Sequence, residues 1–520
     1  MTQIDHTAPN RAAATEKKLP YTSQLPHDLY RAAQVKALDD CAIEDHGIAG
    51  IHLMKHAARA AFTALLNYWP DVEQITVLCG SGNNAGDGFV LAGLASQRRI
   101  PVTVLCVADP DKLTDDARLA YDFARREGVI MQPFLSGQGL EGVVVDALLG
   151  TGLQGPVRDN YAAAITTIND SKRPVLAIDL PSGLCGDTGT ELGVAVKADV
   201  TVSFIGLKQG LLTARGPALT GDLLFADLHI PGDVYRTQLP SVQRLQLSDL
   251  LAILPERDGD AHKGDFGHVM VIGGDYGYAG AAAMAGEASA RMGAGLTCVA
   301  TQPEHVAALV ARRPELMVLA ADSGQTLEPL LAKPTVLVLG PGLGQSPWSE
   351  QMLQQALKTH LPLVLDADGL NLLAEGRVSS GIRRDNWILS PHPGEAARLL
   401  DCSVATVQSD RFAAAQTLQK KFGGTVLLKG AGTVIAAADG SLSVANVGNP
   451  GMASGGMGDV LSGVIGGLLA QGLDPCEATK LAVCLHGEAA DMAVEEEGQR
   501  GLLAADLMPY LRLLLNSAGQ

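Results

Sequence analysis

Short, uninterrupted runs of valine, isoleucine and leucine recur along almost the whole chain, separated by longer stretches of helical character. The first half contains QITVLC, VTVLCV, GVVVDALLG, PVLAIDLPSG and DVTVSFIG, and the second contains GHVMVIGG, LTCVAT, TVLVLGPG, LPLVLDAD, NWILS and GTVLLKG. Strands that lack alternating polar positions are typical of sheets covered on both faces. The pattern therefore predicts an α/β fold built on mainly parallel sheets.

The runs form two series, and the pattern loosens between them at HIPGDVYRTQLPSVQRLQLSDLL. A chain of 520 residues is too long for one ordinary core, so we expect more than one domain. We place a flexible tail at 1–27, a first α/β domain at 28–236 and a second at 245–517. The pattern from Leu29 to Leu66 predicts helix, and the second domain is expected to end in a mostly helical segment from Gly458 onward.

Composition excludes several functional classes. A net charge of -17 argues against broad electrostatic binding to nucleic acid or to an anionic membrane. The eight cysteines form no CxxC motif and no Cys/His ligand pair, which argues against zinc and disulfide frameworks. No apolar run approaches the length of a membrane span, and the first residues lack the apolar segment of a signal peptide. We therefore expect a cytoplasmic protein with small-molecule substrates.

Polar, glycine-rich turns follow three strands of the first series. In SGNNAGDG, residues 81–88, successive N–H groups at a helix start predict an anion site. The glycines at 80, 82, 86 and 88 are expected to adopt backbone conformations closed to other residues. Asp146 and Asp179 each end a strand. Because ligands collect at the carboxyl ends of parallel strands, we expect one pocket here, although either acid could instead be structural.

Three of these side chains offer oxygen atoms and no nitrogen or sulfur ligand. Asn84, Asp146 and Ser182 would together suit a hard cation of low charge better than zinc.

GSGNNAGDGFVLA, VVDALLGTGLQGP and AIDLPSGL together resemble the epimerase domain of the NAD(P)H-hydrate repair enzymes, over roughly 28–236. The resemblance implies a Rossmann-like three-layer αβα domain that interconverts the R and S hydrates of NADH and NADPH. It also implies a potassium ion held by Asn84, Asp146 and Ser182. On the early helix the chain departs from the family, because LMKHAARA places Lys55 and His56 where a Leu-Met-Glu-Asn-Ala-Gly-like stretch is common. The implied substrate contacts are Asn83, Asn84, Ala85, Gly86, Asp87, Gly150, Thr151, Gly152, Leu153, Gln154, Gly155, Pro156 and Asp179.

The chemistry of epimerisation needs an acid/base. In the hydrated cofactor the ring nitrogen lone pair can expel the neighbouring hydroxyl, and water can return to either face of the flat iminium. Asp179 is the candidate for protonating the departing oxygen and deprotonating the returning water. Its alternative role is that of a structural acid at the PSG turn.

The second half carries the motif VGNPGMASGGMGDVLSGVIGGLLAQG, residues 447–472. Glycines at 455, 456 and 458 precede a strongly helical, apolar run, so their N–H groups predict an anion hole for a phosphoryl group. Asp459, on the first turn, is expected to accept a proton from a hydroxyl that attacks this phosphoryl. The alternative is that Asp459 only favours the helix dipole.

This motif resembles the ribokinase-like fold. With ERDGDAHKGDFGHVMVIGGDYGYAGAAAMAG, GPGLG, ILSPHPGEAARLL and VLLKGAGTVI, the resemblance narrows to the ADP- or ATP-dependent NAD(P)H-hydrate dehydratases, over about 245–517. The implied catalytic base is Asp459. The implied hydrate contacts are Ala281, Gly342, Gly344, His392 and Asp459, and the implied nucleotide contacts are Lys429, Gly430, Ala431, Gly432, Thr433 and Gly458. The resemblance also implies Mg²⁺ bound with ADP or ATP, dehydration of the S epimer with release of phosphate, and a homo-oligomer.

Residue chemistry leaves alternatives open for several of these side chains. Lys429 could offer a point charge to a phosphate or could simply be a solvated lysine. His392 could bond the substrate or be structural, and Asp366 and Asp368 could assist a metal or nucleotide or cap a helix. A vitamin or sugar kinase with a Rossmann-like partner domain would share the glycine-lined anion hole, and a non-catalytic first domain is a third possibility. The family's bacterial-type members favour ADP.

Overall fold

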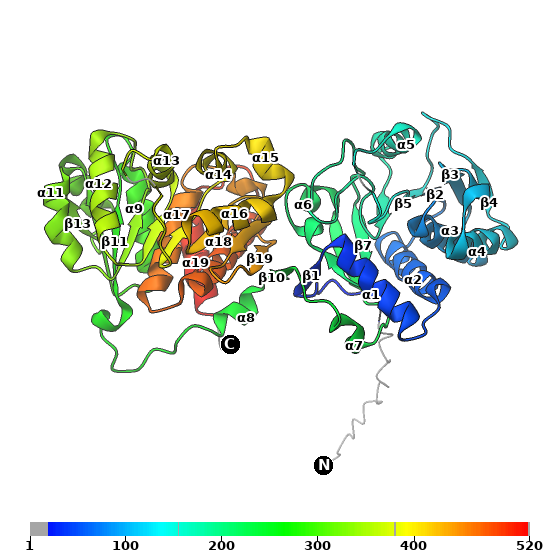
Figure 1. Ribbon diagram of the computed structural model, residues 1–520, viewed down its shortest axis with the longest axis horizontal. Coiled ribbons are helices and arrows are strands. Elements are labelled where there is room, and N and C mark those ends of the chain that lie inside the picture. Colours follow the sequence, from blue (N-terminus) through cyan, green and yellow to red (C-terminus); the bar gives the residue numbers. More distant parts are fainter. Residues whose placement is uncertain (1–18, 154, 379–380, 518–520) are drawn as a thin grey trace, which may run out of the picture.

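The computed structural model describes residues 19–153, 155–378 and 381–517, and in it two α/β lobes lie side by side along the longest axis (Figure 1). Each lobe is built on a mainly parallel sheet. Side chains of one strand alternate between cores on opposite faces. Val77 and Cys79 enter one core of the N-terminal lobe, whereas Leu78 enters the other. The predicted class, two α/β domains in one chain, is confirmed.

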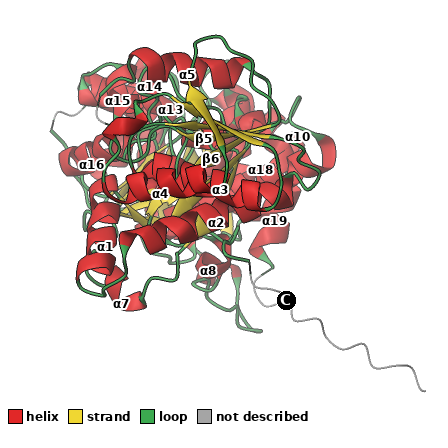
Figure 2. Cartoon of the chain, turned by 90° about the vertical axis from the view of Figure 1, so that its right-hand side faces the viewer, coloured by secondary structure: helices red, strands yellow, loops and turns green. Residues whose placement is uncertain are grey.

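The N-terminal sheet has the strand order β4-β3-β2-β5-β6-β7-β9, and its neighbouring strands are parallel. The order reverses between β2 and β5, which is where open α/β sheets bind ligands. Helices α2, α3 and α4 lie alongside one another on one face (Figure 2). The strands are β2 (Ile75–Cys79), β3 (Val102–Cys106), β4 (Ile130–Pro133), β5 (Val143–Ala147), β6 (Val175–Ile178), β7 (Val200–Phe204) and β9 (Asp222–Ala226). The helices are α1 (Ala32–Glu44), α2 (Gly50–Tyr68), α3 (Asn83–Gln97), α4 (Asp115–Arg126), α5 (Asp159–Asp170), α6 (Gly216–Leu219) and α7 (Gly232–Tyr235).

The C-terminal lobe has the order β13-β12-β11-β14-β15-β16-β17-β18-β19, parallel as far as β17 and antiparallel beyond. Its strand order reverses between β11 and β14. The strands are β11 (His268–Ile272), β12 (Leu296–Thr301), β13 (Met317–Ala320), β14 (Val336–Leu339), β15 (Leu363–Leu365), β16 (Trp387–Leu389), β17 (Thr425–Leu428), β18 (Thr433–Ala436) and β19 (Leu442–Ala445). The helices are α8 (Leu247–Leu251), α9 (Ala279–Arg291), α10 (Val306–Arg312), α11 (Gly324–Leu327), α12 (Pro347–Lys358), α13 (Ala367–Glu375), α14 (Pro393–Leu400), α15 (Val404–Ser409), α16 (Arg411–Phe422), α17 (Met457–Ala470), α18 (Pro475–Glu497) and α19 (Leu507–Leu515).

Three short strands join the lobes. β10 (Val242–Arg244) pairs with β19 on one side and with β1 (Asp28–Tyr30) on the other, and β1 pairs with β8 (Leu207–Lys208). The C-terminal sheet thus continues into residues of the N-terminal half (Figure 1).

The described part of the predicted tail contacts the N-terminal lobe and the joining strand β10. Thr22 and Phe225 exchange two backbone hydrogen bonds of 2.8 and 2.9 Å, and Arg244 donates to the carbonyls of Leu25 and Pro26. Residues 1–18 lie outside the described residues.

The predicted helical stretch Leu29–Leu66 is a strand followed by two helices. β1 precedes α1, and the chain turns at Gly47, whose φ is +67°, before α2 begins. The local pattern indicated the helices correctly, but β1 is fixed by pairing with residues about two hundred positions away, which no local pattern reveals.

Glycines in α17 allow this apolar helix to pack closely against α9. A Cβ atom at Gly463 would lie 2.2 Å from the carbonyl oxygen of Ala285, and one at Gly467 would lie 2.6 Å from that of Ser289. The GVIGG sequence therefore fixes the position of α17 and, with it, the helix start that carries Asp459. Within the described ranges, no helix is long and apolar enough to cross a membrane.

Candidate active sites

A cavity of about 610 Å³ opens where β2, β5 and β6 end in the N-terminal lobe. The cavity is lined by most of the predicted substrate contacts, namely Asn83, Asn84, Asp87, Gly150, Thr151, Gly152, Leu153 and Asp179. Ala85, Gly86, Gly155 and Pro156 are not among its lining residues, and Gln154 lies outside the described residues. The three predicted strand ends therefore do converge on one hollow.

The glycines at 80, 86 and 88 allow close packing, whereas a Cβ atom at Gly82 would meet open space among the described residues. None of the four has the unusual backbone angle that the sequence analysis expected. Gly80, Gly82, Gly86 and Gly88 all have negative φ. A Cβ atom at Gly80 would lie 2.0 Å from the carbonyl oxygen of Leu148, and one at Gly88 would lie 2.5 Å from the Cβ of Ala147. Because these two glycines have no side chains, α3 can pack directly against β5. Because α3 begins at Asn83, its first amides lack helical partners.

Asn84, Asp146 and Ser182 are all buried and are joined by hydrogen bonds through the Leu149 carbonyl, and Asn84 also lines the cavity. The Ser182 hydroxyl and amide donate to the two carboxylate oxygens of Asp146 at 2.6 and 2.7 Å. Asn84 Nδ2 donates to the Leu149 carbonyl at 3.2 Å, but its buried Oδ1 has no hydrogen-bond partner among the described residues. Burial raises the pKa of Asp146 to about 6, against the opposing effect of the Ser182 hydrogen bonds. Among the described residues, an oxygen without a partner that is joined to a buried carboxylate through the Leu149 carbonyl and Ser182 fits a hard cation of low charge.

Asp179 is paired with a lysine that the sequence analysis missed. The Lys208 ammonium, almost fully buried, forms an ion pair with Asp179 Oδ1, and the Phe204 amide donates to the same oxygen at 3.3 Å. Asp179 has a φ of +69°, a backbone conformation that costs free energy and is concentrated at functional sites. The AIDLPSG motif shows Asp179 only as an acid at the end of a strand and gives no sign of its lysine partner. Lys208 comes from the segment IGLKQG, where a lone lysine among apolar and glycine residues was the available signal.

Two further carboxyl groups face this ion pair. Burial, then repulsion from Asp179 and Asp39, raises the pKa of Asp87 well above its usual range. Burial likewise raises the pKa of Asp39 to about 6, with the Lys208 charge opposing the shift. The cavity thus combines two carboxyl groups of raised pKa, Asp39 and Asp87, with the ammonium of Lys208, and groups of this kind can transfer protons.

The early helix contributes apolar contacts to the cavity. Leu53, Met54 and Ala57 of α2 line it, whereas Lys55 and His56 do not. His56 Nδ1 instead lies 3.2 Å from the Leu228 carbonyl. The departure from the family pattern therefore falls outside the cavity wall.

The C-terminal site begins at α17. Gly456, with a φ of +94°, caps the helix, and Asp459 lies on the first turn. Burial, then repulsion from Asp366, raises the pKa of Asp459 to about 7, and the charge of Lys429 works in the opposite direction. A carboxyl group that loses its proton near neutral pH, beside free helix amides, is suited to act as a general base next to an anion.

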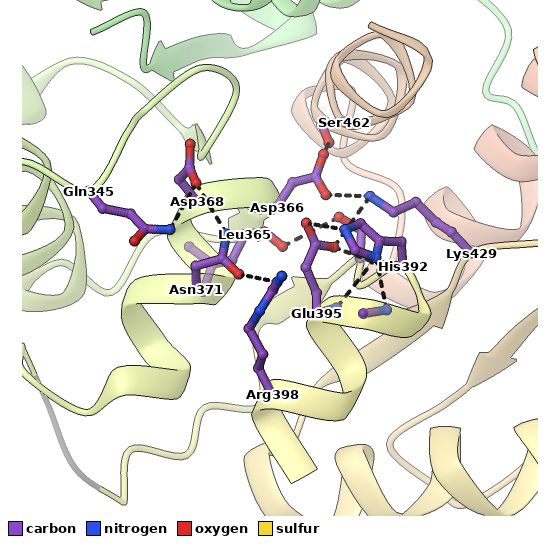
Figure 3. A network of polar contacts seen from close by, with 12 residues as sticks. Gln345, Leu365, Asp366, Asp368, Asn371, His392, Glu395, Arg398, Lys429 and Ser462 are labelled. Atoms are coloured by element: carbon purple, nitrogen blue, oxygen red, sulfur yellow. Dashed lines mark hydrogen bonds and ion pairs between the residues drawn. The ribbon is translucent and has the colours of Figure 1, made fainter. Parts of the chain in front are cut away.

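Asp366 links α13, α17 and β17 (Figure 3). Its Oδ1 accepts from Lys429 Nζ at 2.7 Å and its Oδ2 from the Ser462 hydroxyl at 2.7 Å. A Cβ atom at Gly458 would lie 3.4 Å from both Asp366 Oδ2 and Lys429 Nζ. The predicted nucleotide contacts Lys429 and Gly458 are therefore brought together, and Asp366, the strand-end acid, orients the lysine.

His392 caps α14. Its Nδ1 accepts from the amides of Gly394 and Glu395 at 2.9 and 3.4 Å, so the ring proton sits on Nε2, which lies 3.3 Å from Glu395 Oε1. Burial, then the charges of Lys429 and Arg398, lowers the pKa of His392. Burial raises the pKa of Glu395 to about 7, although Lys429 opposes the shift. Glu395, which the sequence analysis missed, belongs to the same cluster (Figure 3).

The GPGLG turn packs against the start of α9. A Cβ atom at Gly342 would lie 3.0 Å from the Cβ of Ala281, so these two predicted hydrate contacts adjoin. The Gly344 amide donates to Asp368 Oδ2 at 2.9 Å. β14 and β15 are parallel, so GPGLG and Asp368 lie at the same sheet edge as Asp366, which adjoins Gly458. The Asp368 charge also contributes to the raised pKa of Asp459.

The remaining predicted nucleotide contacts form the turn between β17 and β18. Gly430 and Ala431 are exposed, Gly432 is buried beneath them, and Thr433 begins β18. The Thr433 hydroxyl donates to the Gly430 carbonyl at 3.1 Å and closes the turn.

Comparisons with known proteins agree with this division. A family model described as NAD(P)H-hydrate dehydratase matches residues 269–512, and one described as YjeF-related protein N-terminus matches residues 50–210. The chain is 48% identical to the bifunctional NAD(P)H-hydrate repair enzyme Nnr of Coxiella burnetii, over 94% of this chain and 99% of that one. It is 42% identical to the enzyme of the same name from Escherichia coli, over 96% of each.

Among solved structures, the chain is similar to the ADP/ATP-dependent NAD(P)H-hydrate dehydratase from Bacillus subtilis co-crystallised with ATP and Mg²⁺. The two are 30% identical, with a TM-score of 0.46, over 52% of this chain and 96% of that one.

Proposed function

Because this chain belongs to the family of bifunctional NAD(P)H-hydrate repair enzymes, we propose that it restores hydrated NADH and NADPH in two steps, one in each lobe. The N-terminal domain, 28–236, epimerises the R and S hydrates. The C-terminal domain, 245–517, dehydrates the S epimer with ADP or ATP and releases phosphate. The observation that carries the proposal is that one chain contains both a strand-end cavity with the Asp179–Lys208 pair and a glycine-lined helix start with Asp459.

In the epimerase, Asp179 is the acid/base. It protonates the ring hydroxyl as the nitrogen lone pair expels it, and it takes a proton from the water that returns to the iminium. Lys208 holds the Asp179 carboxylate in place through their ion pair. Asn84, Asp146 and Ser182 would hold the potassium ion, which when bound supplies positive charge beside the substrate phosphates.

In the dehydratase, Asp459 accepts the proton of the ring hydroxyl as its oxygen attacks the terminal phosphoryl of the nucleotide. The amides at the start of α17 stabilise the charge of the transferred group. The ring nitrogen lone pair then expels phosphate, and loss of a ring proton regenerates the dihydronicotinamide. Mg²⁺ bound with the nucleotide would supply charge neutralisation on its phosphates. Asp366, whose two carboxylate oxygens accept from Lys429 and Ser462, acts by orienting the lysine.

The finer expectations rest on the sequence alone. They are a preference for ADP, assembly into a homo-oligomer and a cytoplasmic location, without nucleic-acid or membrane partners.

The experiment is to incubate the protein with both epimers of hydrated NADH, add ADP or ATP, and follow dihydronicotinamide absorbance and orthophosphate together. We expect the two products to appear in equal amounts and both epimers to be consumed. A stable phosphorylated hydrate without the return of absorbance would instead indicate a small-molecule kinase.

A further inference from the structure

The turn between β17 and β18 is braced by the other half of the chain. Gly432 has a φ of +61°, and a Cβ atom there would lie 1.8 Å from the carbonyl oxygen of Leu212. The Thr213 hydroxyl donates to the Gly432 carbonyl at 2.8 Å, and the Ala214 amide donates to the Ala431 carbonyl at 3.1 Å. Residues 212–214 follow β8, in the N-terminal half. The shape of this turn is therefore fixed by both halves.

Arg411 supports the same turn from below. This side chain is 1% exposed, and its Nε donates to the Thr213 hydroxyl at 3.1 Å. Its Nη2 donates to the carbonyls of Leu428 and Lys429 at 3.1 and 3.2 Å. Thr213 is fully buried, so its hydroxyl connects the guanidinium to the Gly432 carbonyl without intervening water.

The Arg411 charge has no carboxylate counter-charge among residues 19–153, 155–378 and 381–517. A Cβ atom at Gly430 would lie only 3.0 Å from its Nη1, so the cation lies directly under the exposed top of the turn. Burial lowers the pKa of Arg411 to about 10, which leaves the side chain charged at neutral pH. An unneutralised cation at this depth attracts any anion that settles on the turn.

We propose that Thr213 and Arg411 are positioning residues for the nucleotide of the dehydratase. They hold Gly430, Ala431 and Gly432 in the one conformation in which the turn amides and the Lys429 ammonium meet the phosphates. The inference rests on the proposed function, in which this turn contacts the nucleotide. It adds that the N-terminal half completes the nucleotide site of the C-terminal half.

The physical reason is preorganisation. A turn with two glycines loses more backbone entropy on ordering than a turn without glycine, and this cost would otherwise reduce nucleotide affinity. Because Thr213 and Arg411 order the turn when the protein folds, nucleotide binding does not have to supply the free energy of ordering it. Loss of the Thr213 hydroxyl would leave the Arg411 Nε and the Gly432 carbonyl buried without this partner, which loosens the turn.

The test is Thr213→Val in the full chain, with steady-state kinetics of both activities. We expect KM for the nucleotide to rise about tenfold, with kcat for dehydration, KM for the hydrate and the epimerisation rate all within about twofold of wild type. Thr213→Ser, which keeps the hydroxyl, should return KM to near the wild-type value. Thr201→Val is the matched control, because Thr201 is also buried and donates to a carbonyl, that of Thr220, but lies within the N-terminal sheet.

Two results would overturn the proposal: an unchanged nucleotide KM in Thr213→Val, or an equal loss of both activities. Amide hydrogen exchange of residues 429–433 gives an independent measurement, and we expect exchange to be faster in Thr213→Val than in wild type before nucleotide is added.

Calorimetric titration of ADP into Lys429→Met and into Thr213→Val distinguishes a failure of this proposal from a failure of the proposed function. If Lys429→Met binds ADP like wild type, the nucleotide site is misassigned. If Lys429→Met loses ADP while Thr213→Val retains it, only the positioning role is wrong.

Discussion

At the scale of single residues, the role of Asp459 as a general base depends on the ability of its carboxyl group to accept a proton. We expect Asp459→Asn to lower kcat of dehydration by about 10²–10⁴-fold, because the amide cannot accept the hydroxyl proton. Epimerisation should be unchanged, since Asp459 lies in the other lobe. Absorbance with the purified S epimer measures dehydration, and chromatographic separation of the two hydrates, starting from the purified R epimer, measures epimerisation.

The pH dependence follows from the same carboxyl group. Only ionised Asp459 acts as a base, and its pKa is raised to about 7. We therefore expect kcat of dehydration to increase about tenfold per pH unit below pH 7 and to level off above it. A profile that is flat between pH 5.5 and about 8 would contradict the role of Asp459.

Stability should show the opposite trend at this residue. Because the folded protein binds the Asp459 proton more tightly than the unfolded chain, the contribution of this group to stability is lost as pH rises towards 7. Asp459→Asn cannot ionise, so we expect it to be more stable than wild type at pH 8, on the order of 1 kcal/mol. The difference should shrink at pH 5, and urea unfolding at the two pH values tests this.

At the scale of elements, the cluster between α3, β5 and β6 predicts a specific ion effect. We expect saturating K⁺ to raise Tm of the wild type by about 2–4 °C more than Na⁺ does. Asn84→Ala should lose this increment, because it removes the Asn84 Oδ1, which has no partner in the part of the chain that the structure describes. Asn169→Ala is the control. Asn169 bonds backbone groups from α5, so its replacement should leave the increment intact, and an increment retained in Asn84→Ala would contradict the ion site.

The contact between the β2–α3 turn and β5 predicts a steric effect. Gly80→Ala places a methyl group against the Leu148 carbonyl, so we expect a loss of about 1–3 kcal/mol of stability. Gly139→Ala, at a position with open space, should change stability by less than about 0.5 kcal/mol. Denaturant midpoints of the two variants provide the comparison.

Elements buried on both faces could be predicted from the sequence, and elements defined by their partners could not. β2, β5, β14 and β17 lie where apolar runs predicted them. β4, whose Ile130 is largely exposed, lies at a sheet edge and lacks a continuous apolar signal. β8 and β10 are too short for any periodicity.

The candidate sites show the same limit. Asp179 and Asp459 stand in glycine-rich motifs that identify them locally. Lys208 and Glu395 acquire their meaning only from charged partners that folding brings near, Asp179 and Lys429 respectively. For the glycines at 80 and 88, the sequence indicated a tight turn but not its cause, since the crowding atoms belong to β5 and the residue after it.

At the scale of the whole molecule, the two activities depend on each other through the epimers. In Asp179→Asn we expect the dehydratase to consume the S epimer at the wild-type rate and then to stall at the rate of uncatalysed epimerisation. Wild type should consume both epimers in one phase. Absorbance progress curves with the mixed hydrates distinguish the two, and a single phase in Asp179→Asn would show that this aspartate is not needed for epimerisation.

The pairing of β10 between β19 and β1 restricts how the gene can be altered. A spacer of glycine and serine inserted inside Val242–Arg244 would slip the register on both sides at once, whereas one placed in the exposed loop after α8 would leave it intact. Exchanging either half for that of a distant relative would require the recipient to supply a compatible strand edge. We therefore expect sequence changes in this protein to be restricted at the pairing of β10 with β19 and β1, as well as at the two active sites.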